Sequence, residues 1–170
     1  MVVAVKICGI TSEEALEAAI GAGADFAGFV FFKRSPRHLS LAKAAELSER
    51  ARGRIATVAL TVNASYGFFK AIARSIRPDF VQLHGTETPA RVQSIGRLFK
   101  FRIIKAIKVG APPDVAAAAA YEPVADIVLF DAQAPQGSAR PGGNGEIWRA
   151  RSSRWSARFP CAPILCFPAA

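Results

Sequence analysis

The amino-acid sequence predicts an α/β fold of the parallel-barrel type, with an active site at one rim. Apolar segments typical of strands alternate with segments typical of helices along most of the 170 residues. Regular alternation of this kind indicates a parallel sheet with right-handed crossovers. Residues with chemical capability follow several of the apolar segments, at Cys8, Arg37, His84 and Asp131. Because the strand ends of a parallel barrel share one rim, we expect these four side chains to lie there.

The first unit is a strand over residues 2–7 followed by a helix. The strand segment is almost continuously apolar, which is typical of a strand covered on both faces. Thr11 and the polar residues after it predict a capped helix start, and Gly21 and Gly23 end that helix.

The same pattern repeats four times and closes with a sixth strand. We predict strands over 26–32, 55–62, 80–84 and 101–109, and a sixth strand over 127–131. The helices that follow the first four of these strands are predicted over 41–51, 66–76, 89–95 and 113–121. An open doubly wound sheet shares this alternation, so the local pattern alone allows both folds. The turn after the first strand, Cys8-Gly-Ile-Thr, is not a dinucleotide fingerprint, and functional residues at several strand ends favour the barrel.

Composition predicts one soluble, cytoplasmic domain. The chain is 51% hydrophobic, which suits one core rather than two. No apolar run approaches the roughly 20 residues of a membrane span, and the N-terminus lacks the pattern of a signal peptide, so we expect no membrane partner. The cysteines Cys8, Cys161 and Cys166 form no paired framework, so reduced thiols are expected, although Cys161 and Cys166 remain a possible pair.

The net charge of +9 does not by itself predict binding to nucleic acid. The Lys and Arg residues are scattered through predicted helices and loops, and they do not cluster with aromatic residues. We therefore expect no nucleic-acid partner.

Six short motifs occur in order along the chain. They are Lys6-Ile7-Cys8-Gly9-Ile10-Thr11, Gly28-Phe29-Val30-Phe31, Ser35-Pro36-Arg37, Val81-Gln82-Leu83-His84-Gly85, Leu129-Phe130-Asp131 and Gly142-Gly143-Asn144-Gly145. Through these motifs the chain resembles the phosphoribosylanthranilate isomerase family, and the resemblance runs from the start to about Gly145. It implies a small (β/α)8 TIM barrel that works in tryptophan biosynthesis.

The resemblance implies an Amadori rearrangement of a phosphorylated small-molecule substrate. Asp131 would be the general acid, Cys8 the general base and Arg37 a ligand of the anthranilate carboxylate, for which a guanidinium offers a two-pronged contact. His84 would either shape the pocket or bond a backbone carbonyl group. Acid and base side chains suffice for this reaction, so no cofactor and no metal is expected.

The glycines Gly142, Gly143 and Gly145 have two interpretations. They form either a flexible turn or a backbone that approaches an anionic substrate closely.

The proposed acid and base each need a particular environment. An aspartic acid keeps its proton best when it is buried, and the apolar residues 127–130 supply such surroundings for Asp131. A cysteine acts as a base through its thiolate, which a nearby cation or a helix N-terminus favours. Lys6 is expected to point to the opposite face of the strand from Cys8, so the sequence shows no group that lowers the pKa of Cys8. Without the motifs, Cys8 would be interpreted as a buried apolar residue and Asp131 as a cap or turn residue.

The resemblance stops near Gly145, where the chain divides into two parts. We expect a partial barrel domain over residues 1–145 and an aberrant tail over residues 146–170, which is rich in Arg, Ser, Pro and Cys. Six strands would be present, and strands seven and eight would be missing. One choice of codons for residues 163–170 reads His-Pro-Leu-Leu-Ser-Gly-Gly in a neighbouring frame. That string resembles the missing turn of strand seven, so we interpret the tail as the product of a shifted reading frame.

An incomplete barrel leaves the edges of the first and sixth strands uncovered. Residues 163–169 or a second copy of the chain would be needed to cover an edge, and we expect neither. We therefore predict a poorly stable chain with little or no isomerase turnover, and the oligomeric state stays open. The alternatives are an inactive fragment, or an interaction protein that completes its sheet with a partner. A histidine-pathway sugar-phosphate isomerase is disfavoured, because those enzymes use paired aspartates where this chain has Cys8.

Overall fold

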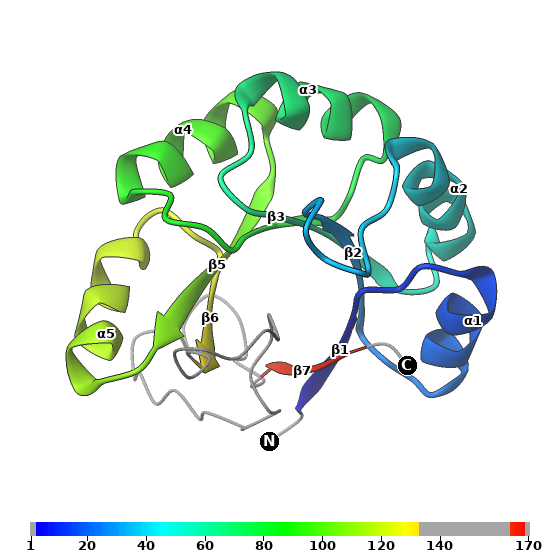
Figure 1. Cartoon of the computed structure of the whole chain (residues 1–170), viewed down its shortest axis with the longest axis horizontal. Coiled ribbons are helices and arrows are strands. Elements are labelled where there is room, and N and C mark those ends of the chain that lie inside the picture. The colour runs from blue at the N-terminus through cyan, green and yellow to red at the C-terminus, as the bar shows by residue number, and fades with distance from the viewer. Residues whose placement is uncertain (1–2, 133–163, 169–170) are drawn as a thin grey trace.

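The structure is a computed structural model that describes residues 3–132 and 164–168. In this part of the chain, seven strands form one sheet that curves around an interior, and the helices lie on its outer side (Figure 1). The strands are β1 Ala4–Cys8, β2 Phe26–Phe31, β3 Ala56–Thr61, β4 Phe80–Leu83, β5 Arg102–Val109, β6 Ile127–Ala132 and β7 Ile164–Pro168. The helices are α1 Glu13–Gly21, α2 Leu41–Ala51, α3 Tyr66–Ser75, α4 Pro89–Phe99 and α5 Pro112–Ala117, which a 3-10 turn over Ala118–Tyr121 continues.

The six predicted strands and five predicted helices are all confirmed. The predicted bounds of α2 coincide with the observed ones, whereas α4 continues four residues further than predicted, to Phe99. The segment predicted as a helix over 113–121 is divided between α5 and a 3-10 turn, which is a common way for a helix to end.

Polar caps explain why four of the helices begin where they do. The side chains of Ser12, Ser40, Ser65 and Thr88 accept hydrogen bonds from the backbone N–H groups of Ala15, Lys43, Phe68 and Arg91. Each bond satisfies one of the N–H groups that the first turn of a helix leaves without a partner in the helix.

All neighbouring strands are parallel, in the order β6-β5-β4-β3-β2-β1-β7. This confirms the predicted α/β barrel class. The expectation that the edge of β1 would be uncovered is wrong, because β7 pairs with β1 from Ala4 opposite Ile164 to Cys8 opposite Pro168. Among the described strands, β7 and β6 are the two edges of the sheet.

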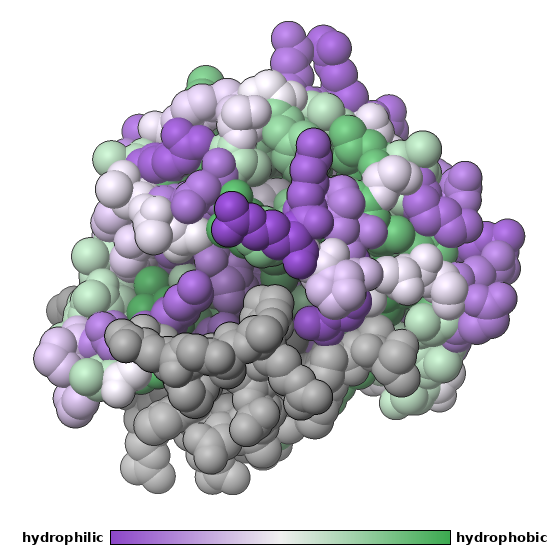
Figure 2. All heavy atoms as spheres, viewed as in Figure 1, coloured by the Kyte–Doolittle hydropathy of each residue, from purple (hydrophilic) through white to green (hydrophobic). Residues whose placement is uncertain are grey.

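The boundary expected at residue 145 lies outside the described residues, as does most of the tail over 146–170. Figure 2 shows mostly hydrophilic side chains over the outer helices on the face in view. In the part of the chain that is described, no helix is both long and apolar enough to cross a bilayer.

The two faces of the sheet have different neighbours. Residues that face the helices form the main core, which includes Leu16, Ala27, Phe29, Leu47, Ala59, Phe69, Val81, Val92, Ile95 and Ile103. Residues that face the interior of the barrel form two smaller clusters, which are centred on Cys8, Val30 and Leu60 and on Val58, Phe80 and Ile104. Because side chains alternate along a strand, Lys6, Gln82 and Asp131 also lie on the inner face.

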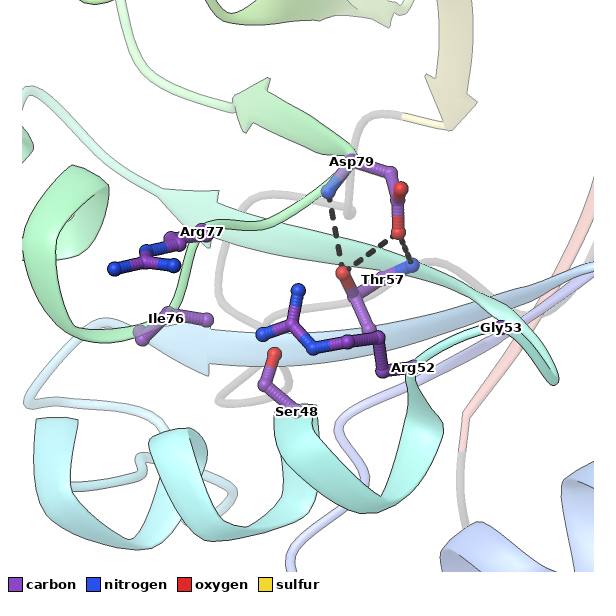
Figure 3. A pocket seen from close by; sticks show the side chains of 7 residues that line it. All are labelled: Ser48, Arg52, Gly53, Thr57, Ile76, Arg77 and Asp79. Atoms are coloured by element: carbon purple, nitrogen blue, oxygen red, sulfur yellow. Dashed lines mark hydrogen bonds between the residues drawn. The ribbon is translucent and has the colours of Figure 1, made fainter.

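Aspartates tie the amino ends of neighbouring strands together in pairs. Asp25, Asp79 and Asp126 each precede an even-numbered strand, and each accepts a hydrogen bond of 2.7 Å from a backbone N–H at the start of the preceding odd-numbered strand, at Val5, Thr57 and Ile103. Asp79 also accepts a bond of 2.9 Å from the Thr57 hydroxyl. A small polar pocket surrounds this last pair (Figure 3). It lies at the amino ends of β3 and β4, whereas the predicted active-site residues follow the carboxyl ends of strands.

Candidate active site

Cys8 is the last residue of β1 and lies on the inner face of the sheet. Its exposed fraction is 8%, and it packs with Val30 and Leu60. The backbone carbonyl oxygen of Cys8 accepts a hydrogen bond of 3.1 Å from Nη1 of Arg37. The structure therefore brings together two of the residues that the sequence singled out.

Arg37 reaches Cys8 from the loop between β2 and α2. Its side chain passes over Gly9, where a Cβ atom would collide with it, and Gly9 has a positive φ of 89° that also favours glycine. A guanidinium group carries five N–H donors, of which the bond to Cys8 uses one. Arg37 is half-buried, so it is placed to bind an anionic group at this rim.

His84 and Asp131 form a second pair at the carboxyl ends of β4 and β6. Nε2 of His84 lies 3.1 Å from Oδ2 of Asp131, and Nδ1 of His84 lies 3.0 Å from the amide nitrogen of Gln82. With the Gln82 amide oriented in this way, its nitrogen donates to Nδ1, and Nε2 carries the proton that is donated to Asp131. Of the two interpretations of His84, this contact favours the one in which it shapes the pocket.

Asp131 is less buried than the sequence suggested. Its side chain is 30% exposed and that of His84 is 21% exposed, because both lie at the rim rather than among the apolar residues deeper in the barrel. Figure 1 shows β1 and β6 on opposite sides of the interior. Gly142, Gly143 and Gly145 lie outside the described residues.

The expectation that Lys6 points away from Cys8 is wrong. The two residues are two positions apart in one strand, and strand side chains repeat on the same face with a period of two. The Lys6 side chain is fully buried, with 1% of the residue exposed. A Cβ atom added to Gly28 would lie 3.0 Å from Nζ of Lys6 and 3.3 Å from Sγ of Cys8. The ammonium and the thiol therefore share the space above Gly28.

A buried ion pair that the sequence analysis missed supports the loop after β4. Nζ of Lys105 lies 2.9 Å from Oε2 of Glu87, and it also donates to the carbonyl oxygens of Leu83 and Gly85. Glu87 in turn accepts from the backbone N–H groups of Asn63 and Gly85. These contacts fix the backbone on both sides of His84.

The net effect of these contacts is a lowered pKa for Glu87. Burial alone raises the pKa of Glu87, but the hydrogen bond from Lys105 and the backbone N–H of Asn63 outweigh burial and hold that pKa below its ordinary value. Glu87 is therefore charged when the protein is folded at neutral pH.

Within the described ranges, no group of three or more His, Cys, Asp or Glu residues is arranged to hold a metal ion.

Comparisons with known proteins identify the family. The family model for N-(5'-phosphoribosyl)anthranilate (PRA) isomerase matches residues 5–150. The N-(5'-phosphoribosyl)anthranilate isomerase of Afipia carboxidovorans is 51% identical over 83% of this chain and 60% of the relative. The isomerase of Rhodopseudomonas palustris is 50% identical over 83% of this chain and 65% of the relative. The chain thus spans less than two thirds of the length of these curated relatives.

Solved structures agree with the sequence comparisons. The phosphoribosylanthranilate isomerase of Thermotoga maritima matches with a TM-score of 0.73 and 31% identity, over 79% of this chain and 63% of that one. A phosphoribosylanthranilate isomerase solved in complex with reduced 1-(O-carboxyphenylamino)-1-deoxyribulose 5-phosphate matches with a TM-score of 0.70 and 31% identity, over 77% of this chain and 66% of that one. By its motifs, its fold and these matches, the chain belongs to the N-(5'-phosphoribosyl)anthranilate isomerase family.

Proposed function

We propose that the protein is a phosphoribosylanthranilate isomerase. It would convert N-(5-phosphoribosyl)anthranilate to 1-(2-carboxyphenylamino)-1-deoxyribulose 5-phosphate in the cytoplasmic pathway of tryptophan biosynthesis. The observation that carries the proposal is the position of Cys8 and Asp131. Cys8 is the last residue of β1, Asp131 lies in β6, and both are on the inner face of the sheet. One matching isomerase binds a reduced form of the proposed product.

The rearrangement needs an acid first and then a base. Asp131 gives its proton to the ring oxygen of the sugar, the bond between that oxygen and C1 breaks, and the nitrogen lone pair forms an iminium. The Cys8 thiolate then removes the proton from C2, which leaves an enolamine that tautomerises to the ketone. The N–H that His84 directs at Asp131 stabilises the carboxylate that remains after the first proton transfer.

The remaining contacts belong to binding. Arg37 lies beside Cys8, and its planar guanidinium suits the anthranilate carboxylate. The backbone of Gly142, Gly143 and Gly145, which lie outside the described residues, would approach an anionic group of the substrate. The barrel domain of this proposal covers residues 1–145 and the tail covers residues 146–170. Neither a nucleic acid nor a membrane takes part in the reaction.

The alternative is a member of the family that binds without turnover, either as an inactive fragment or as an interaction protein. The position of β6 at an edge of the described sheet favours this alternative, because such an edge can accept a strand from another chain.

Turnover of the purified chain decides between the two functions. The assay follows the loss of substrate fluorescence for the unchanged chain, for Cys8→Ala and Asp131→Asn, and for Lys70→Met, which alters an exposed residue of α3. The isomerase proposal predicts turnover that both site variants reduce by at least about 100-fold and that Lys70→Met retains. Substrate binding by a folded chain without turnover would instead support the alternative.

A further inference from the structure

We propose that Lys6 is a positioning residue whose ammonium holds the sulfur of Cys8 in the thiolate form. This inference rests on the proposed function, in which Cys8 is the base, and it supplies the cationic group that the sequence did not reveal. The proton leaves the thiol for solvent, and the ammonium keeps its own proton, so the two side chains become an ion pair.

The first argument is the geometry around Gly28. Cys8 and Gly28 are register partners in β1 and β2, and the missing side chain at Gly28 leaves room for the ends of both Lys6 and Cys8. Nζ and Sγ lie 3.0 Å and 3.3 Å from one common point above Gly28. The distance between Nζ and Sγ is therefore no more than about 6 Å. An opposite charge within about 4–6 Å favours the ionised form of a group.

The second argument is burial. Lys6 is 1% exposed and Cys8 is 8% exposed, so water screens the interaction between them only weakly. A buried ammonium is costly unless negative charge or acceptor groups surround it. A thiolate at Cys8 supplies negative charge close to the Lys6 ammonium. In the proposed reaction, the same thiolate acts as the base.

Two kinds of group other than Lys6 also contact Cys8. In the part of the chain that is described, Val30 and Leu60 pack against Cys8 from β2 and β3 and carry no charge. Arg37 is the second cation near Cys8, but its Nη1 bonds the backbone carbonyl oxygen. The experiment must therefore separate the effect of Lys6 from that of Arg37.

A titration followed by NMR measures the state of the thiol without requiring access by a reagent or turnover. The chain is labelled with [3-13C]cysteine, and Cys8→Ala assigns one of the three cysteine signals. The midpoint for Cys8 is then compared in the unchanged chain and in Lys6→Met, Lys6→Arg and Arg37→Met. Lys70→Met is the control for the loss of one positive charge at an exposed site.

We expect Cys8 in the unchanged chain to ionise below the ordinary thiol value of about 8.5. Lys6→Met should raise the midpoint by about one pH unit or more. Lys6→Arg keeps the positive charge and should leave the midpoint close to that of the unchanged chain. Lys70→Met should leave the midpoint unchanged. Arg37→Met should shift the midpoint less than Lys6→Met. An unchanged midpoint in folded Lys6→Met would overturn the proposal.

A second variant covers the case in which Lys6→Met does not fold. Gly28→Ala keeps every charge but places a methyl group 3.0 Å from Nζ of Lys6, 3.2 Å from Cα of Cys8 and 3.3 Å from Sγ of Cys8, so these neighbours must shift by a few tenths of an ångström, and the flexible Lys6 side chain yields more easily than the Cys8 backbone. The midpoint of Cys8 should then rise. A midpoint at or above the ordinary thiol value in the unchanged chain would also refute the proposal. Because none of these measurements needs catalysis, a low midpoint without turnover would reject the isomerase function alone, and turnover with no effect of Lys6 would reject only the role of Lys6.

Discussion

At the scale of single residues, the inner face of the barrel holds pairs of polar side chains. The two members of each pair are two positions apart in one strand and therefore lie on the same face. Lys6 and Cys8 are two positions apart, as are Gln82 and His84. In each pair the first residue lies deeper in the barrel and sets the electrostatic or hydrogen-bonding state of the second. The chemistry at the rim therefore depends on residues below it.

Gln82 is expected to fix the tautomer of His84. Its amide nitrogen lies against Nδ1, whereas its buried carbonyl oxygen has no hydrogen-bond partner among the described residues. In Gln82→Glu a carboxylate oxygen replaces the amide nitrogen and accepts from a protonated Nδ1. With [15N]histidine, chemical shifts should report the Nε2–H tautomer in the unchanged chain and protonation of both nitrogens in Gln82→Glu at neutral pH.

The chain makes this measurement simple, because its two histidines are His38 and His84. His38→Gln assigns the spectrum and serves as the control, since His38 is exposed. A protonated Nδ1 in the unchanged chain at neutral pH would mean that the Gln82 amide is rotated. The oxygen of Gln82 would then accept from His84.

At the scale of elements, the loop after β4 depends on the ion pair between Glu87 and Lys105, whose side chains are 0% and 2% exposed. Glu87→Gln leaves a buried ammonium without its charged partner, and we expect a loss of about 3–5 kcal/mol in the free energy of unfolding at pH 7. Glu17→Gln, which breaks the exposed pair with Arg54, should change the free energy of unfolding little.

The contribution of Glu87 should also depend on pH. Because its pKa is lower in the folded chain than in the unfolded chain, the stabilisation is complete above the unfolded pKa of about 4.3 and is lost as pH falls through the folded value. Urea unfolding of the unchanged chain and of Glu87→Gln should therefore show a difference in free energy that is largest at pH 7 and declines below about pH 4. A difference that grows as the pH falls would contradict the lowered pKa.

The elements were predictable wherever local pattern and tertiary packing agree. Helix starts at Ser12, Ser40 and Ser65 follow from capping, and the apolar strands follow from burial on both faces. The aspartates at 25, 79 and 126 had a signal in the sequence, since each directly precedes an even-numbered strand. The partners Glu87 and Lys105 had no such signal, because they lie 18 positions apart and only the turn of the chain after β4 brings them together.

At the scale of the whole molecule, the position of β7 could not be derived from its local sequence. Residues 164–168 are a short apolar run that fits either a strand or a buried helix, and nothing local names β1 as the neighbour. The long-range pairing of Ala4 with Ile164 decides the outcome. The four strand-end residues were predictable as members of one rim. Their division into one pair at β1 and another between β4 and β6 depends on how the sheet closes.

The pairing of β7 with β1 predicts the effect of removing β7. Shortening the chain after residue 163 takes away the strand that lies against Ala4–Cys8 and exposes backbone groups of β1 to water or to another chain. We expect faster amide hydrogen exchange in β1 and a concentration-dependent increase in particle size on gel filtration. The control lies within the same molecule, because β4 keeps both of its neighbours, β3 and β5, and should exchange as before. Unchanged exchange in β1 would mean that β7 does not protect this edge in solution, whereas faster exchange in both strands would mean that β7 stabilises the whole sheet.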